Sequence, residues 1–106
     1  MTSARISVPA SARRGDIIEI KTLVSHAMET GFRRTHLGVP IARDIVTTFT
    51  CVYNGVEVFS AELFPSVSAN PYLHFTIRAT ESGALEFRWS GDNGFSVTET
   101  AKIAVT

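Results

Sequence analysis

Apolar and polar residues alternate in short segments along most of the chain, and turn-forming residues separate these segments. An alternation with a period of two places every second side chain on the same face of a β-strand. Several such segments in succession are typical of an all-β sandwich or barrel. The length of 106 residues corresponds to about one domain, so we expect residues 1–106 to form a single domain with one core.

About seven segments show this alternation, and we expect strands over residues 5–8, 16–24, 45–53, 56–63, 72–79, 84–90 and 95–105. Asn54-Gly55 predicts a hairpin between the third and fourth segments, because a type I′ turn needs a positive φ at both positions. In the last segment Glu99 falls among inward positions, so we expect a β-bulge there. Seven short antiparallel strands fit an immunoglobulin-like, or fibronectin-like, β-sandwich. The alternation predicts a core of Ile18, Ile20, Phe49, Phe75, Phe87 and Trp89.

Two stretches break the strand pattern. Residues 25–44 separate two expected strands by about 20 residues, and an irregular connection of that length in a small domain is usually functional. Residues 64–71 contain two prolines around small polar residues, which is typical of a rigid loop at the edge of a sandwich. These two loops are therefore the first places to look for function.

The overall charge argues against partners that are polyanions. The formal net charge is zero and the pI is about 6.8, so we expect no binding to nucleic acid or to an acidic membrane. Residues 1–43 carry seven basic and three acidic side chains, whereas residues 44–106 carry three basic and seven acidic ones. Folding can intersperse the two signs, or it can leave a polarised surface that docks a charged partner.

The sequence shows no pattern that predicts catalysis or metal binding. The single cysteine, Cys51, lies on the apolar face of an expected strand, and we interpret it as a buried small hydrophobe. The three histidines are not spaced as metal ligands, so we expect no metal site and no cofactor. A weaker alternative is an enzyme with a dispersed site that uses His26, Glu29 and His36.

Several residues of the long loop have two interpretations. Met28 and Phe32 either plug the end of the sandwich, which we favour slightly, or anchor an interface. Arg33, Arg34 and Arg43 either keep the loop solvated or dock an anion or a partner.

Two motifs in this chain resemble those of a known family. Residues 23–33, L-V-S-H-A-M-E-T-G-F-R, resemble the L-V-x-H-P-M-E-T-G-x-R signature of the SoxZ family, the Z subunits of the bacterial sulfur-oxidation carrier complex. Residues 65–71, P-S-V-S-A-N-P, are similar to the P-S-V-S-x-N-P loop of that family. The chain departs from the family pattern at Ala27, where proline is usual, and at Phe64, where glycine is usual. The Trp89 to Gly94 turn matches only loosely.

The resemblance implies an immunoglobulin-like scaffold subunit without catalytic residues of its own. It implies a tight heterodimer with a Y-type sulfur carrier subunit, which holds sulfur intermediates covalently on a glycine-flanked cysteine near its C-terminus during thiosulfate oxidation. Transient contacts with sulfur-oxidation enzymes are also implied. The alternative from the residues alone is a generic β-sandwich interaction module unrelated to sulfur metabolism.

Localisation depends on the same choice. Residues 1–12 contain no apolar stretch that could form the core of a signal peptide. The resemblance implies a periplasmic protein that is exported together with its signal-bearing partner, whereas the generic module would be cytoplasmic. The two loops that carry the motifs, residues 25–34 and 64–71, supply the candidate residues of a partner or client interface: His26, Met28, Glu29, Gly31, Phe32, Arg33, Arg34, Pro65, Ser66, Ser68, Asn70 and Pro71.

Overall fold

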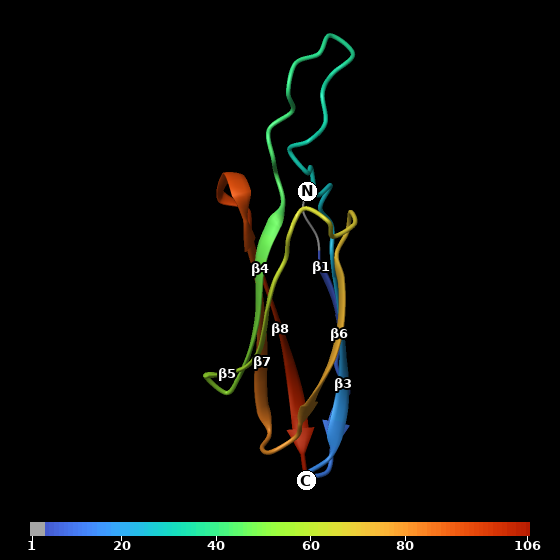
Figure 1. The fold of residues 1–106 in the computed structure, drawn as a ribbon. Coiled ribbons are helices and arrows are strands. Elements are labelled where there is room, and N and C mark those ends of the chain that lie inside the picture. The colour runs from blue at the N-terminus through green and yellow to red at the C-terminus, as the bar shows by residue number, and fades with distance from the viewer. Residues whose placement is uncertain (1–3) are drawn as a thin grey trace.

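Two β-sheets pack face to face in the computed structural model, which describes residues 4–106 (Figure 1). The eight strands of these residues are β1 Ala4–Ser7, β2 Ser11–Ala12, β3 Ile17–Val24, β4 Val46–Tyr53, β5 Val56–Glu62, β6 Tyr72–Arg78, β7 Gly83–Gly91 and β8 Ser96–Val105. The first sheet has the order β1-β3-β6 and the second β2-β8-β7-β4-β5. A single 3-10 turn, η1 Asp92–Gly94, interrupts the strands, and no helix in this part of the chain is long and apolar enough to span a bilayer.

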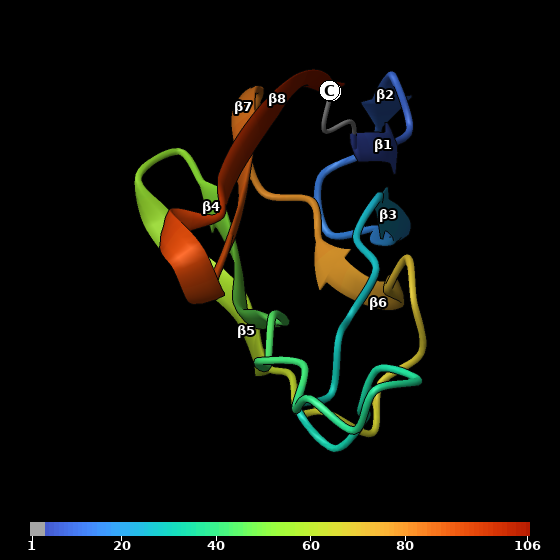
Figure 2. The same cartoon turned by 90° about the horizontal axis from the view of Figure 1, so that it is seen from above.

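The sandwich confirms the expected all-β, immunoglobulin-like class, but the expected seven strands are one too few. The additional strand, β2, has two residues and pairs in parallel with β8, whereas the other pairs of strands in residues 4–106 are antiparallel. Two residues are too short to show a period of two, so the pattern could not reveal it. Because β1 pairs in the first sheet and β2 in the second, this stretch of chain crosses between the sheets on one side (Figure 2).

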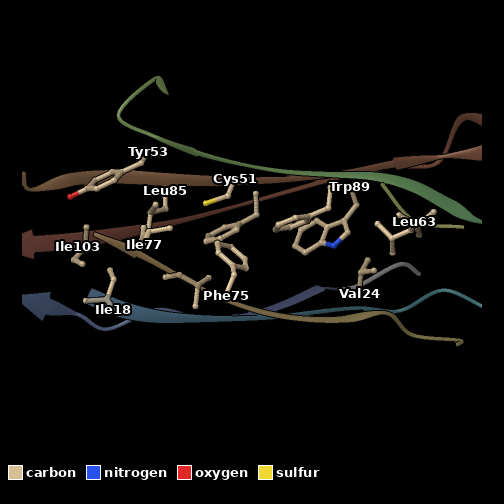
Figure 3. Packing of buried hydrophobic residues seen from close by; sticks show 14 of the residues in the cluster. Ile18, Val24, Cys51, Tyr53, Leu63, Phe75, Ile77, Leu85, Trp89 and Ile103 are labelled. Atoms are coloured by element: carbon tan, nitrogen blue, oxygen red, sulfur yellow. The ribbon is translucent and has the colours of Figure 1, made fainter. Parts of the chain in front are cut away.

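The core lies between the inner faces of the two sheets and contains the predicted apolar residues. Phe49 on β4 is at its centre, with its ring 5.8 Å from that of Phe75 and 5.2 Å from that of Trp89. Phe59 and Phe75 stack with centroids 4.1 Å apart, which joins the two sheets at their β5 and β6 edges. Figure 3 shows Phe75, Ile18 and Val24 from the first sheet facing Trp89, Leu85 and Cys51 from the second.

The expected bulge at Glu99 is absent. Register between β7 and β8 is unbroken from Gly83 opposite Ile103 to Ser90 opposite Ser96, with Glu99 opposite Phe87. Glu99 is half-buried on the inward side of β8. Beside Glu99, β8 is an edge strand, because β2 pairs only with Ala104 and Val105. The Glu99 side chain is therefore only partly covered.

The hairpin expected at Asn54-Gly55 is confirmed. Both residues have a positive φ, 49° and 84°, and the turn joins β4 to β5. The Asn54 side chain also binds the neighbouring turn, since its Oδ1 accepts from the backbone N–H of Ala84 at 3.0 Å. A Cβ at Gly83 would lie 1.8 Å from that oxygen, so a larger residue at this position would displace the Asn54 amide.

Trp89 offers a direct test of the core. It is 1% exposed, and its indole Nε1 has no hydrogen-bond partner among residues 4–106. We expect Trp89→Ala to lower the free energy of unfolding by about 3–5 kcal/mol through the cavity that it leaves. Trp89→Phe should lose only about 1–2 kcal/mol, because the phenyl ring fills most of the cavity that alanine leaves empty.

Urea denaturation of both variants gives the comparison. Thr98→Ala on the exposed face of β8 is the control and should stay within about 0.5 kcal/mol of the parent. Equal losses for the two Trp89 variants would contradict the assignment of the loss to the cavity.

Candidate partner interface

Most of the long connection between β3 and β4 is folded as a narrow hairpin that extends beyond the sandwich (Figure 1). We call residues 30–43 the arm. Its base is a bridge between Glu29 and Asp44, in which each backbone N–H donates to the carbonyl of the other at 2.8 Å. Farther out, Arg34 lies opposite Pro40. The molecule measures 60 Å along its long axis and 20 Å across, and the arm contributes to that elongation.

The end of the arm is a tight turn organised by Thr35. Its backbone N–H donates to the carbonyl of Val39 at 2.8 Å, and its Oγ1 accepts from the backbone N–H of Leu37 and that of Val39. Gly38 has a φ of 80°, and its carbonyl accepts from the Arg34 guanidinium at 3.0 Å. The arm therefore has its own hydrogen-bonded structure.

Below the arm, Met28 closes the end of the sandwich. It is 5% exposed, and its Sδ accepts from the backbone N–H of Val46 at 3.3 Å. The backbone N–H of Met28 donates to Nδ1 of His26 at 2.9 Å, which stabilises a residue whose φ is 54°. Of the two interpretations given to Met28, the plug is the one that the structure shows.

His26 and Asn70 join the two sequence motifs. The backbone N–H of His26 donates to Oδ1 of Asn70 at 2.9 Å, and the backbone N–H of Asn70 donates to the carbonyl of His26 at 2.7 Å. Next to this pair, the N–H of Val24 donates to the carbonyl of Pro71 at 3.2 Å. Asn70 has a φ of 54°, a conformation that asparagine tolerates better than most residues. The two loops therefore form one continuous surface at this end of the sandwich.

The imidazole of His26 is enclosed rather than presented to solvent. Its side chain is 7% exposed, its ring stands edge-on to Phe95 at 4.7 Å, and Nε2 lies 3.6 Å from a carboxylate oxygen of Asp44. His36 lies at the far turn of the arm, while Glu29 lies at its base. The structure therefore does not bring His26, Glu29 and His36 together.

Two arginine–carboxylate pairs fix the base of the arm. Arg33 binds Glu29 through Nη2 at 2.5 Å and Nε at 3.1 Å, and these hydrogen bonds lower the pKa of the Glu29 carboxyl group and raise the pKa of Arg33. Arg43 binds Asp92 with two hydrogen bonds of 2.8 and 2.9 Å. Asp92 also accepts from the backbone N–H of Ile45 at 3.1 Å, and its pKa is lowered, chiefly by Arg43.

Sequence reasoning missed Asp92, because it lies 49 residues from Arg43 and no local pattern connects them. Gly31 was found through its motif, and the structure supplies the reason for glycine. Its φ is 89°, and a Cβ there would lie 3.0 Å from Cβ of Arg43. The outgoing and returning segments of the arm approach each other closely at this point.

Beyond the base, the arm carries apolar side chains that are exposed to solvent. Phe32 is 86% exposed, so the interpretation that it plugs the sandwich is wrong. Phe32 lies in the arm, and the arm extends beyond the ends of the strands (Figure 1). Leu37 at 79% and Val39 at 55% are also exposed, and sequence reasoning did not single them out.

The second motif forms a compact loop, residues 64–71, between β5 and β6. The backbone N–H of Val67 donates to the carbonyl of Phe64 at 2.9 Å. Pro71 is buried and Pro65 half-buried, whereas Ser66 and Ser68 are exposed. Phe64, where the related motif usually has glycine, is 58% exposed and adds an apolar side chain to this end of the molecule.

Cys51 is fully buried within β4, and burial raises the pKa of its thiol to about 12, as expected for a core residue. Within residues 4–106, no three metal-ligating side chains lie close enough to hold an ion. What remains on the surface is an arm with arginines and exposed apolar side chains.

Solved structures place this fold in a known class. The chain is similar to the superoxide reductase (neelaredoxin) from Ignicoccus hospitalis, with a TM-score of 0.76 and 14% identity over 98% of this chain and 80% of that one. It is similar to the sulfur carrier protein SoxY from Chlorobium limicola f. thiosulfatophilum, with a TM-score of 0.67 and 14% identity over 97% and 78% of the chains. It is also similar to the CARDB domain of PF1109 from Pyrococcus furiosus, with a TM-score of 0.61 and 12% identity over 99% of this chain and 94% of that one.

At such identities these likenesses concern the fold, and they define an immunoglobulin-like β-sandwich protein. The family model described as sulphur oxidation protein SoxZ matches residues 5–102. The chain belongs to the SoxZ family, and so is a subunit of the sulfur-oxidation (Sox) system, which confirms the resemblance seen in its two motifs. Comparison with curated protein sequences gave no significant match.

The contact between the motifs can be tested at Asn70. We expect Asn70→Ala to destabilise the protein by about 1–2 kcal/mol, because it removes the acceptor for the His26 N–H and places alanine at a positive φ. Asn70→Asp keeps an acceptor oxygen and should stay within about 0.5 kcal/mol. Urea denaturation measures both, and equal losses would show that the side-chain hydrogen bond contributes nothing.

The Arg43–Asp92 pair predicts a dependence on pH. Because the pKa of Asp92 is lowered in the folded protein, its stabilising effect is present above the unfolded pKa and is lost as the pH falls through the folded value. We expect the melting temperature of the parent to exceed that of Asp92→Asn near pH 7, and the difference to shrink in acid below about pH 4. Thermal melts of both proteins from pH 2 to 7 give the measurement. A difference that does not change with pH would contradict the assignment to the charged carboxylate.

Proposed function

We propose that this chain is a non-catalytic scaffold subunit of a periplasmic sulfur carrier complex. Its stable partner is a Y-type subunit that holds sulfur intermediates covalently on a cysteine near its C-terminus during thiosulfate oxidation. Enzymes of sulfur oxidation contact the complex transiently. Export to the periplasm occurs together with the partner, whose signal directs both chains.

The burial of Cys51 is the observation that supports a scaffold role for this chain and a carrier role for its partner. Thiolates, not thiols, form covalent sulfur adducts. Burial raises the pKa of the Cys51 thiol to about 12 and leaves it no exposed surface, so the thiol stays protonated near pH 7. Cys51 is the one cysteine among the 106 residues, which supports the proposal that a different chain holds the intermediates.

The end of the sandwich that carries the arm and residues 64–71 is the region to which we assign partner recognition. Several of the candidate residues have local structural roles there: His26, Met28, Glu29, Gly31, Asn70 and Pro71 hold the loops in place. Exposed side chains remain for contact with other proteins, including those of Phe32, Arg34, Ser66 and Ser68.

Co-expression with the Y-type subunit tests the proposal. Native mass spectrometry should show a stable one-to-one heterodimer. Brief treatment with iodoacetamide should alkylate the terminal cysteine of the partner and leave Cys51 unmodified. When the complex is isolated from cells that are oxidising thiosulfate, added sulfur mass should be found on the partner chain alone.

A Cys51→Ala variant is the matched control and should form the same complex. A chain that remains monomeric or forms only homo-oligomers in the presence of the partner would contradict the proposal, as would sulfur mass on Cys51. Cell fractionation with and without the partner tests the export step, because the chain should reach the periplasm only when the partner is present.

A further inference from the structure

The arm carries large apolar side chains that no part of the described chain covers. Phe32, Leu37 and Val39 are 86%, 79% and 55% exposed. The arm extends past the ends of the strands, so neither sheet lies beneath it (Figure 1). Apolar side chains gathered on one exposed element of a folded protein usually mark an interaction site.

The pairing of the arm distributes these side chains over both of its faces. Arg34 lies opposite Pro40, and the N–H of Ile41 donates to the carbonyl of Arg33 at 3.0 Å. Side chains alternate between faces along each chain of a hairpin. Phe32 therefore shares a face with Arg34 and Pro40, while the next position, Val39, shares the opposite face with Ile41.

Leu37 lies in the turn of the hairpin, so the tip of the arm is apolar as well. An element with apolar groups on both faces and at its tip cannot bury them against a flat surface. It needs a partner surface that encloses it, that is, a groove.

The arm is also held in a defined conformation. Hydrogen bonds close its turn, and the Glu29–Asp44 bridge and two ion pairs fix its base. A preorganised element loses little conformational entropy on binding, so more of the contact energy contributes to affinity.

Charge restricts the chemistry of the groove. Residues 30–43 contain three arginines and no aspartate or glutamate. Arg33 and Arg43 are paired with carboxylates of the chain itself, at Glu29 and Asp92. Arg34, in contrast, has no carboxylate within ion-pair distance in residues 4–106, and it contacts only a backbone carbonyl. A carboxylate at the rim of the partner groove would complement it.

We propose that the arm inserts into an apolar groove of the stable partner subunit, with a partner carboxylate bound to Arg34. This inference rests on the proposed function, since it takes the Y-type subunit as that partner. A permanent partner is favoured over a transient client because extensive apolar exposure requires lasting cover, and obligate interfaces are the more hydrophobic ones.

The first experiment compares affinities for the purified Y-type subunit. We expect the double variant Phe32→Ser, Leu37→Ser to weaken the complex by about 100-fold or more, because it removes two central apolar anchors. The matched control, Ile17→Ser with Val56→Ser, removes two exposed apolar side chains outside the arm and should bind within about threefold of the parent. Melting temperatures of all three proteins should be similar, because the altered side chains are exposed in each.

Cross-linking tests insertion. A benzoylphenylalanine placed at position 32 and another at position 39 should each cross-link to the partner, because a groove contacts both faces of the arm. Cross-linking from only one of the two positions, or from neither, would overturn insertion. Arg34→Glu should weaken binding at low salt by at least about tenfold, while Arg34→Lys should bind close to the parent.

The outcomes separate the two proposals. If the parent and the control variant both fail to bind the Y-type subunit, the proposed function is wrong. If the parent, the control and the arm variant all bind equally well, the function stands and the inserted arm is overturned. An arm-dependent homodimer of this chain that persists when the Y-type subunit is present would overturn it too.

Discussion

The packing of aromatic rings around Phe49 is the interaction on which the rest of this structure depends. Phe49 contacts rings from β5, β6 and β7, so it links both sheets through one side chain. The same strand, β4, follows the arm directly, and the buried residues Ile45 and Val46 continue the core up to the base of that arm. The position of the arm is therefore fixed by the hydrophobic core and not by the loop alone.

Sequence patterning revealed the parts of the fold that repeat. The strands with clear alternation, such as β3 and β7, bury the side chains that their period predicts. Sequence patterning failed where the local structure depends on one neighbouring strand. Strand β2 exists because β8 offers it a backbone edge, and Glu99 fits in an unbroken β8 because it is only partly covered there.

The candidate site shows a similar division. The motif around His26 could be recognised in the sequence, but its structural role could not, because Asn70 lies 44 residues from His26. Asp92, which fixes the base of the arm, likewise lies 49 residues from Arg43 and 47 from Ile45. Most of the motif residues hold the arm in place. The exposed apolar side chains of the arm, Leu37 and Val39 among them, lie in a stretch that has no strong local pattern, and only the fold shows that they are exposed.

The closed base of the arm has a consequence for how such proteins diversify. Because Glu29 and Asp44 are bridged neighbours, the chain leaves the sandwich and returns to it at almost the same point. Residues inserted or exchanged between them alter the reach and surface of the arm without shifting a strand, and longer loops cost little additional closure entropy. Specificity for one partner or another can therefore evolve within a single hairpin, while the core that folds the domain stays constant.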